Sequence, residues 1–440
     1  MTYPNRKPDS PAQPGRREFL ERSALGTLVG ALAGSLWSAT PGAKSLAQLV
    51  PFQLISPSRC IDPPAGSVGG ASIGTQIVGT ALAGKKVRIA KAHIGDAIRF
   101  PNSSGDVWTT TWADDDHLYS AADDTTGFNK ACNSNLAVHR ITGGPPPNVQ
   151  GETVNPMAEF GKATELKEDG ACWKASGLTC VDGVLYLAVS RHYYDGVGDT
   201  SADSAHHFWI QETWDASIVK STDHGKTWSE APKLGKAMFP GRVFSNPFFV
   251  QYGKDGKGSK DGADQYVYAV SNDGTWNNGN WMTLGRVSRG LIGRLDADDW
   301  EFVHGFDDKG RPIWRPRHDN ALCIFRSPGR ASMTGIHYIA PLDLYVMPQW
   351  HYSRLDEPAR RWKLTRWEFY SAPAPWGPWT PFHTQDFEPQ GFYNPSIPSK
   401  FISEDGRKFW IFVAGDFTAS EQPGNFYGLN MLPVTLEVET

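Results

Sequence analysis

Charge is scarce in this 440-residue chain, and it forms no basic stripe. Charged residues make up 20% of the sequence, and 43 Lys and Arg against 47 Asp and Glu give a net charge of −4. Proteins that bind a phosphate backbone usually carry a basic patch, so we expect no nucleic-acid partner. The hydrophobic share of 40% is enough for a packed core, which argues against an intrinsically disordered chain.

Cysteine is also rare, with five residues in the whole chain. So few thiols exclude a small disulfide scaffold. In one extended strand Cys172 and Cys180 would lie about 26 Å apart, too far for a disulfide bond, whereas a bond from either to Cys132 stays open. No Cys/His spacing indicates structural zinc, so the sequence predicts no cofactor and leaves only a structural Ca²⁺ open.

Long apolar runs are scarce outside the N-terminal region. Arg16-Arg17 precedes the uncharged, Gly- and Ala-rich run 23–40, and small residues follow at 45–47. This pattern predicts a twin-arginine signal peptide over residues 1–47. The run is too short and too poor in large apolar residues to indicate a membrane span. We therefore expect a protein exported by the twin-arginine route, periplasmic or extracellular, with no membrane span in its mature form.

Aromatic and turn-forming residues, in contrast, are abundant. The chain contains 17 Trp, 14 Tyr, 45 Gly and 32 Pro. Trp and Tyr suit half-buried strands, and Gly and Pro suit turns, which favours an all-β fold. No helical periodicity of note follows residue 50, whereas alternating segments joined by turns recur. The five predicted hairpins cover residues 106–122, 175–189, 247–270, 334–347 and 397–413.

Further strands follow most of these hairpins. They begin in the segments 136–141, 217–221, 284–288 and 364–369. Residues 432–438 could supply an outer strand for the fifth unit, and 86–90 could close the ring. Five units of four strands predict a five-bladed β-propeller over residues 86–440, with six blades as the alternative. Residues 48–85 are then an N-terminal extension.

One short motif marks a turn between outer strands. Residues 221–228 match the pattern S-x-D-x-G-x-T-W, the Asp box of sialidase-type propellers. Asp and Gly shape the turn and Trp packs beneath it, so we interpret this Asp box as a folding element and not as a catalytic motif.

The first hairpin predicts a pair of carboxylates. With its turn centred on Asp115, Asp106 faces Asp124 at the open end, where sites of propellers lie. A register shift of one residue would bring Asp123 or Thr125 there instead. Two facing carboxylates raise the pKa of one of them, which suits a proton donor beside an ionised group. Such a pair is typical of glycosidases, whereas solvated turn residues or a cation site are the alternatives.

Other polar and aromatic residues near the axial ends of these hairpins are candidates for binding sugar hydroxyls and sugar faces. The candidate substrate-binding residues are Trp108, Lys174, His192, Asn246, His337, Tyr393 and Asn394.

Several segments carry a resemblance to a known family. They are Asp106-x-Trp108, 111–115, Leu118-Tyr119, Asp124, 174–177, 184–186, 221–228, Phe248-Phe249, 266–268, 300–302, 374–379 and 399–406. The chain from about residue 86 onward resembles exported bacterial β-propeller proteins long labelled as a domain of unknown function. Endo-D-arabinanase-like glycoside hydrolases are among the relatives of that family. One departure is that Asp123-Asp124-Thr125 stands where the resemblance predicts Gly-Asp-Gly.

The resemblance implies a glycoside hydrolase acting on an extracellular or cell-wall polysaccharide, with an arabinan as one candidate. Its matched acids are Asp106 and Asp124, and we expect Asp106 to be nucleophile or base and Asp124 to be acid/base.

Two other functions compete with this interpretation. The first is a polysaccharide lyase that uses Arg191, His192, Tyr193 and Lys174 around a uronate, and the second is a carbohydrate-binding propeller without catalysis. In each case the partner is a poly- or oligosaccharide. The sequence does not determine the oligomeric state.

Overall fold

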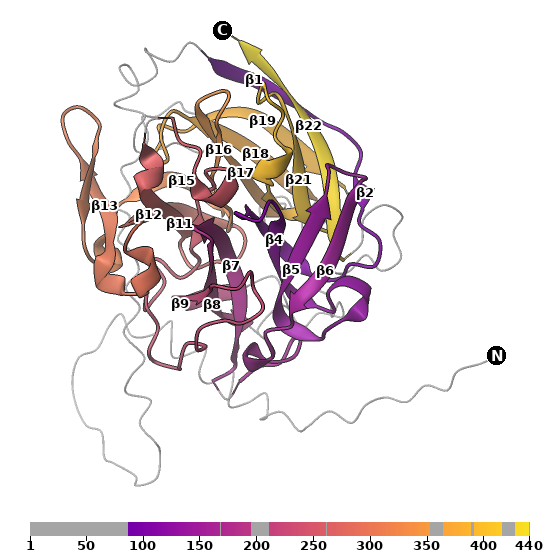
Figure 1. The fold of residues 1–440 in the computed structure, drawn as a ribbon. Coiled ribbons are helices and arrows are strands. Elements are labelled where there is room, and N and C mark those ends of the chain that lie inside the picture. The colour runs from indigo at the N-terminus through magenta and orange to yellow at the C-terminus, as the bar shows by residue number, and fades with distance from the viewer. Residues whose placement is uncertain are drawn as a thin grey trace, which may run out of the picture. The chain divides into compact units, whose positions relative to one another are not determined.

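The computed structural model describes residues 87–167, 169–194, 211–260, 262–352, 364–388, 391–415 and 427–439. The predicted signal peptide (1–47) and extension (48–85) lie outside these residues. The described residues form five antiparallel sheets, the blades of a five-bladed β-propeller, as predicted (Figure 1).

The blades are numbered along the chain, and their strands are given in the order of pairing. The first contains β3 (Asp106–Trp112), β4 (Leu118–Thr125), β5 (Ser134–Gly143) and β6 (Val149–Asn155). The second contains β7 (Ala171–Val181), β8 (Val184–Tyr194) and β9 (Gln211–Ser221). The third contains β10 (Phe248–Phe249), β11 (Tyr266–Asn272), β12 (Gly279–Ser288), β13 (Trp300–Phe306) and β14 (Pro312–Arg315), with β15 (Cys323–Ala331) also paired to β12.

The last two blades complete the ring. The fourth contains β16 (His337–Ile339), β17 (Leu344–Tyr352), β18 (Thr365–Ala372) and β19 (Thr380–Phe387). The fifth contains β20 (Tyr393–Ser396), β21 (Lys408–Ala414), β22 (Leu429–Glu439) and β1 (Arg88–Ile94), with β2 (Ile98–Arg99) also paired to β22.

Helical structure in the described residues is limited to short 3₁₀ turns. They are η3 (Phe128–Lys130), η4 (Ala158–Phe160), η6 (Lys254–Gly256), η7 (Ala263–Gln265), η8 (Ile292–Arg294), η9 (Ala297–Asp299), η10 (His318–Asn320) and η12 (Ser399–Phe401). None of the described helices has the length and apolar character needed to cross a bilayer.

Strands of neighbouring blades contact one another in a closed order. β3 contacts β7, β7 contacts β10, β15 contacts β17, β17 contacts β20, and β20 contacts β3. A parallel bridge between Gln251 and His337 also joins the third blade to the fourth. The first residues of the inner strands therefore meet near one end of the propeller axis.

The ring is closed by strand pairing between the two ends of the described chain. β1 pairs with β22 from Arg88↔Glu439 to Ile94↔Val434, and Figure 1 shows the indigo strand beside the yellow one. The predicted closing role is confirmed for residues 88–90 of the segment 86–90, since β1 begins at Arg88. Backbone hydrogen bonds in this blade thus connect segments more than 300 residues apart, which opposes opening of the ring.

Two details of the strand prediction are wrong. The inner strand of the fifth hairpin is β20 and not residues 397–402, because a 3₁₀ turn begins after Pro398, whose carbonyl accepts from the Phe401 N–H at 2.9 Å. The prediction of four strands in each blade also fails for three blades, because among the described residues the second blade has three strands, the third has six and the fifth has five.

Much of the aromatic content serves blade packing. Trp108, Trp300, Trp350 and Trp367 are fully buried. In the Asp-box segment the Asp223 carboxylate accepts from the Thr227 N–H at 2.9 Å, and the Trp228 indole donates to the Gly225 carbonyl at 3.0 Å. These contacts hold a turn after β9, as expected of a folding element.

Candidate functional site

A cavity of about 240 Å³ lies where the inner strands of several blades begin. Asp106 is the first residue of β3, Tyr393 is the first residue of β20, and Lys174 lies near the start of β7. The lining residues are Asp106, Asp123, Asp124, Ala163, Thr164, Lys174, His192, Gln211, Trp276, Asn277, Tyr352, Tyr393 and Tyr427. Both predicted acids and three of the predicted binding residues are therefore brought together here.

A β-bulge in β3 changes the predicted register at the open end of the first hairpin. Thr109 pairs with Ala121 as predicted, but Asp106 pairs with Asp123. Two residues of β3, Val107 and Trp108, stand opposite one residue of β4, and both have positive φ, 68° and 48°. The predicted pairing of Asp106 with Asp124 is therefore wrong, because the extra residue shifts the register by one.

Asp124 instead approaches the second blade. Its φ of 39° is in the left-handed region, and its carboxylate forms an ion pair with Lys174. The same carboxylate accepts from the Thr164 N–H at 2.9 Å. Burial opposes ionisation, but the charge and hydrogen bond of Lys174 outweigh it and hold the pKa of Asp124 below its ordinary value.

Asp106 has a different environment. Tyr393 donates from its hydroxyl to Asp106 Oδ2 at 2.9 Å, while Asp106 Oδ1 is buried without a hydrogen-bond partner among the described residues. Burial and the charge of Asp124 raise the pKa of Asp106 to about 7. The two carboxylates thus differ in protonation over a wide pH range.

Lys174 lines the cavity and is 1% exposed. Its ammonium group pairs with Asp124 and donates to Asn135 Oδ1 at 3.4 Å. Burial alone would lower the pKa of Lys174, but the surrounding acids, Asp124 first, raise it above its ordinary value. This lysine is therefore a buried cation that favours the ionised form of Asp124, and the sugar-binding role expected from the sequence stays a prediction.

Aromatic and imidazole rings form another part of the wall. The rings of His192 and Trp276 lie 4.7 Å apart between centroids. Burial and the charge of Lys174 lower the pKa of His192 to about 3, so this ring is neutral at ordinary pH. Asn278 fixes the neighbouring Tyr352 by donating to its carbonyl and accepting from its N–H, both at 3.0 Å.

Four predicted binding residues lie outside the cavity lining. Trp108 donates to the Gly105 carbonyl at 2.9 Å within the core, and the Asn246 N–H donates to Ser271 Oγ at 3.0 Å. His337 and Asn394 line a separate cavity of about 10 Å³. Their bonds there are to backbone groups, because His337 Nε2 accepts from the Ile397 N–H and Asn394 Nδ2 donates to the Val107 carbonyl, both at 3.3 Å.

Sequence reasoning missed part of the lining. Trp276 ends the segment 271–276, which is a shortened form of the Asp-box pattern and is the sequence feature that could have indicated this residue. Its position on the cavity wall depends on the connection between β11 and β12. No sequence pattern indicated Thr164, Tyr352 or Tyr427, since these residues lie outside the ends of the predicted hairpins. They line the cavity only because the closed ring brings their segments together.

The disulfide bond from Cys172 or Cys180 to Cys132 that the sequence left open does not form. Cys132, Cys172 and Cys180 are free thiols, so neither Cys172 nor Cys180 is bonded to Cys132. Cys323 is disulfide-bonded.

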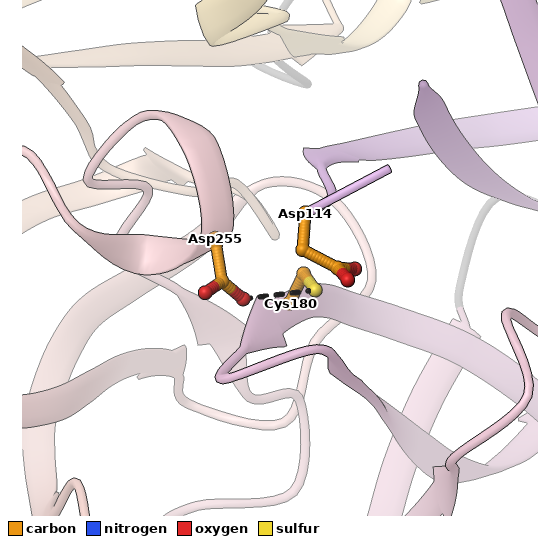
Figure 2. A group of neighbouring side chains, drawn as sticks. All are labelled: Asp114, Cys180 and Asp255. Atoms are coloured by element: carbon orange, nitrogen blue, oxygen red, sulfur yellow. Dashed lines mark hydrogen bonds between the residues drawn. The ribbon is translucent and has the colours of Figure 1, made fainter. Parts of the chain in front are cut away.

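Among the described residues, two groups of side chains have the composition of a metal site. Figure 2 shows the first, Asp114, Cys180 and Asp255, whose ligand atoms lie within 4.8 Å of one another. However, Asp255 Oδ1 accepts from the Gly183 N–H at 2.8 Å and from Cys180 Sγ at 3.4 Å. Asp255 Oδ2 accepts from Lys257 at 2.7 Å, so Lys257 already balances the buried charge.

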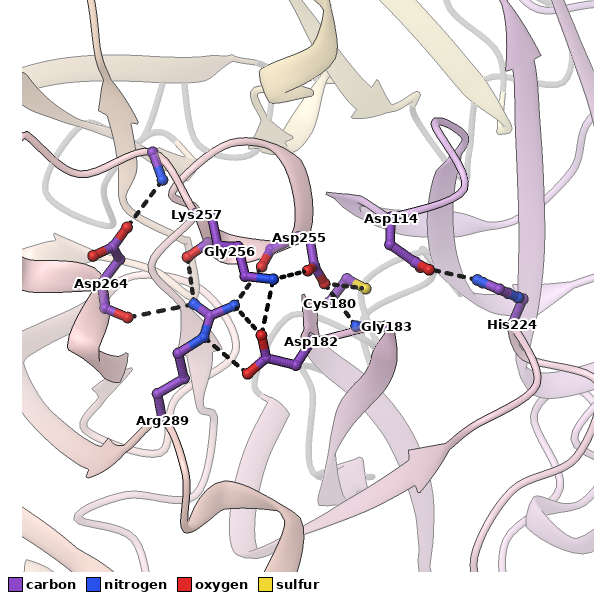
Figure 3. Close-up of polar contacts among 11 residues, drawn as sticks. Asp114, Cys180, Asp182, Gly183, His224, Asp255, Gly256, Lys257, Asp264 and Arg289 are labelled. Carbon is purple, nitrogen blue, oxygen red and sulfur yellow. Dashed lines mark hydrogen bonds and ion pairs between the residues drawn. The ribbon is translucent and has the colours of Figure 1, made fainter.

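The surrounding contacts explain this group as a connection between the second and third blades (Figure 3). Arg289 donates to both carboxylate oxygens of Asp182, at 3.0 and 3.1 Å, and to the Gly256 carbonyl at 2.7 Å. In the second group, which also contains Asp115, His224 bonds Asp114 at 2.9 Å. Neither group shows an unpartnered buried atom that points to a metal.

Comparisons with known proteins identify no family for this chain. No family model matches it, and no curated protein matches it. Similar solved structures include the GH43_1 enzyme from Xanthomonas citri complexed with xylotriose, at 12% identity and a TM-score of 0.39, covering 82% of this chain and 91% of that one. Xylan β-1,4-xylosidase from Bacillus halodurans C-125 is 10% identical with a TM-score of 0.38, and the match covers 77% of this chain and 54% of that one. The Bacteroides ovatus xyloglucan PUL GH43B is 14% identical with a TM-score of 0.38, and the match again covers 77% of this chain and 54% of that one. A likeness this distant defines neither the activity nor the substrate of this protein.

Proposed function

We propose that this protein is an exported glycoside hydrolase that acts on an extracellular or cell-wall polysaccharide. The observation that carries this proposal is the difference between two carboxyl groups of one axial cavity. Asp106 holds its proton up to a pKa of about 7, whereas Lys174 keeps Asp124 ionised. A proton donor beside an ionised carboxylate is the pair that glycosidic bond hydrolysis requires.

The protonation states favour the reverse of the roles expected from the sequence. Protonated Asp106 donates its proton to the glycosidic oxygen as the bond to the anomeric carbon breaks. Ionised Asp124 stabilises the positive charge that develops on the sugar and acts as nucleophile or as base toward water. Tyr393, whose hydroxyl donates to Asp106 Oδ2, orients the acid so that Oδ1 remains available for the proton.

The rest of the cavity suits a sugar. Trp276, Tyr352 and Tyr427 present aromatic groups, and Asn277 and Gln211 present amides, so the lining combines ring faces with hydroxyl partners. Because the resemblance in sequence includes endo-D-arabinanase-like enzymes, an arabinan is the first candidate substrate.

A uronate lyase is less well supported by the same geometry. Arg191 is 2% exposed and donates to Asp169 at 3.1 Å, and Lys174 is paired with Asp124, so both cations already have carboxylate partners. A lyase needs a cation free to neutralise the substrate carboxylate, and the predicted candidates are occupied.

The pH profile of kcat/KM follows from the two carboxyl groups. Asp106 must be protonated, so activity is expected to fall as the pH rises through about 7, the raised pKa of this group. Asp124 must be ionised, and because its pKa is below the ordinary value of 3.8, activity should persist well into the acidic range. Initial rates at low substrate concentration across a pH series measure both limbs. A profile that rises from pH 7 upward would contradict the assignment.

A panel of polysaccharides tests the function itself. The purified protein is incubated with arabinans, xylans, other neutral glycans and uronate-containing glycans, and reducing ends and ultraviolet absorbance are both measured. New reducing ends without ultraviolet-absorbing products support hydrolysis. Unsaturated uronates would indicate a lyase, and glycan binding with no new reducing ends would indicate a binding module.

Export is proposed on separate grounds. The segment 1–47 has the pattern of a twin-arginine signal peptide, and Cys323 is disulfide-bonded, which fits an oxidising compartment.

A further inference from the structure

A third carboxyl group, that of Asp123, lies in the cavity wall and has no part in the mechanism above. Asp123 is 1% exposed and stands directly opposite Asp106 across the first hairpin. Its Oδ1 accepts from the Ala175 N–H at 2.8 Å. Its Oδ2 is buried and has no hydrogen-bond partner among the described residues. One oxygen is thus anchored to β7, and the other is left for a group that enters the cavity.

The charges around Asp123 disfavour its ionised form. Asp106 faces it from β3 and Asp124 follows it on β4, while Lys174 and Cys172 lie on β7. Lys174 is the one cation among the described lining residues, and it forms the ion pair with Asp124. Burial raises the pKa of Asp123 well above its ordinary value; Lys174 opposes this shift, and the charges of Asp106 and Asp124 add to it. Burial also raises the pKa of the Cys172 thiol to about 11, so it stays neutral.

Resting on the glycosidase function proposed above, we propose that Asp123 is a neutral carboxylic acid whose Oδ2–H donates a hydrogen bond to an oxygen of the bound sugar. A buried donor without a partner is costly, and a sugar hydroxyl or ring oxygen supplies the missing acceptor. Asp123 then selects substrates that present an acceptor at this point, and it differs from Asp106 and Asp124 because no proton leaves it.

Two substitutions separate a neutral donor from a charged group. In Asp123→Asn the amide oxygen can keep the bond from the Ala175 N–H, and Nδ2 can take the place of the Oδ2–H donor. Asp123→Ala removes the donor. We expect the alanine variant to raise KM about tenfold with a smaller change in kcat, and the asparagine variant to recover most of that loss. Asp106→Asn is the contrasting variant, since there the amide removes a transferable proton.

Infrared difference spectroscopy tests the protonation state without turnover. The spectrum of the wild type minus that of Asp123→Asn, recorded at about pH 8 where Asp106 is mostly ionised, should contain a carboxylic acid carbonyl band. An absent band overturns the proposal, as does an asparagine variant as inactive as Asp106→Asn or an alanine variant with unchanged KM. If the wild type cleaves no glycan, the glycosidase function fails, and the band still decides whether Asp123 is neutral.

Discussion

Replacement of Asp106 or Asp124 by asparagine is expected to reduce kcat/KM for glycan hydrolysis by about 100- to 10,000-fold, the usual contribution of a positioned acid or base. Asparagine keeps the size of each side chain and its capacity to accept hydrogen bonds. In Asp106→Asn the Tyr393 hydroxyl can still donate to the side-chain oxygen, so the loss reports the missing proton and not a collapsed cavity.

Reducing-end assays on the variants and on Asp308→Asn measure this effect. Asp308 is an exposed aspartate outside the cavity lining, so its amide should leave the rate unchanged. The melting temperature of each variant is recorded to confirm folding. If both site variants are folded and retain full activity, Asp106 and Asp124 are not the catalytic pair.

Replacement of Lys174 by methionine is expected to have the second large effect, on both stability and pH dependence. Lys174 lowers the pKa of Asp124 and of Asp106, so removing its charge raises both values. The range in which Asp106 is protonated and Asp124 is ionised therefore moves to higher pH, and activity near pH 5 falls. Removing one partner of a buried ion pair also costs about 3–5 kcal/mol of unfolding free energy.

Urea unfolding and the pH profile of kcat/KM measure these two consequences separately. The double variant Lys174→Met/Asp124→Asn is the control for stability, because it removes both charges. It should be more stable than the sum of the two single effects predicts, since no uncompensated carboxylate remains. Additive losses of stability, together with an unshifted pH profile, would show that Lys174 does not control Asp124.

The strands that build the propeller were predictable because strand-forming residues and turns are local features of the sequence. Residues 106–112 are rich in Thr, Val and Trp and are joined to 118–122 by a turn, and the structure places β3 and β4 there. Residues 86–90 have the same character, and β1 indeed completes the fifth blade. Where proline interrupts the pattern, as at Pro398, the strand prediction was displaced, because the 3₁₀ turn that follows depends on a hydrogen bond that alternation does not encode.

The pairing within the site was harder to predict. Counting outward from the turn correctly pairs Trp112 with Leu118 and Thr109 with Ala121, and then one extra residue in β3 shifts the count. Bulges of this kind depend on local packing, here on the burial of Trp108 against Phe128 and His139. Asp123 therefore occupies the position opposite Asp106, and Asp124 approaches Lys174 from another blade.

Scarce charge, abundant aromatic and turn residues and five alternating hairpins were enough to determine an all-β propeller and to place acids at the start of its first blade. Only the tertiary structure decided which acid is ionised. The pKa of a carboxyl group depends on burial and on charges that come from distant parts of the chain. Lys174 from the second blade and Tyr393 from the fifth reach Asp124 and Asp106 only when the ring is closed.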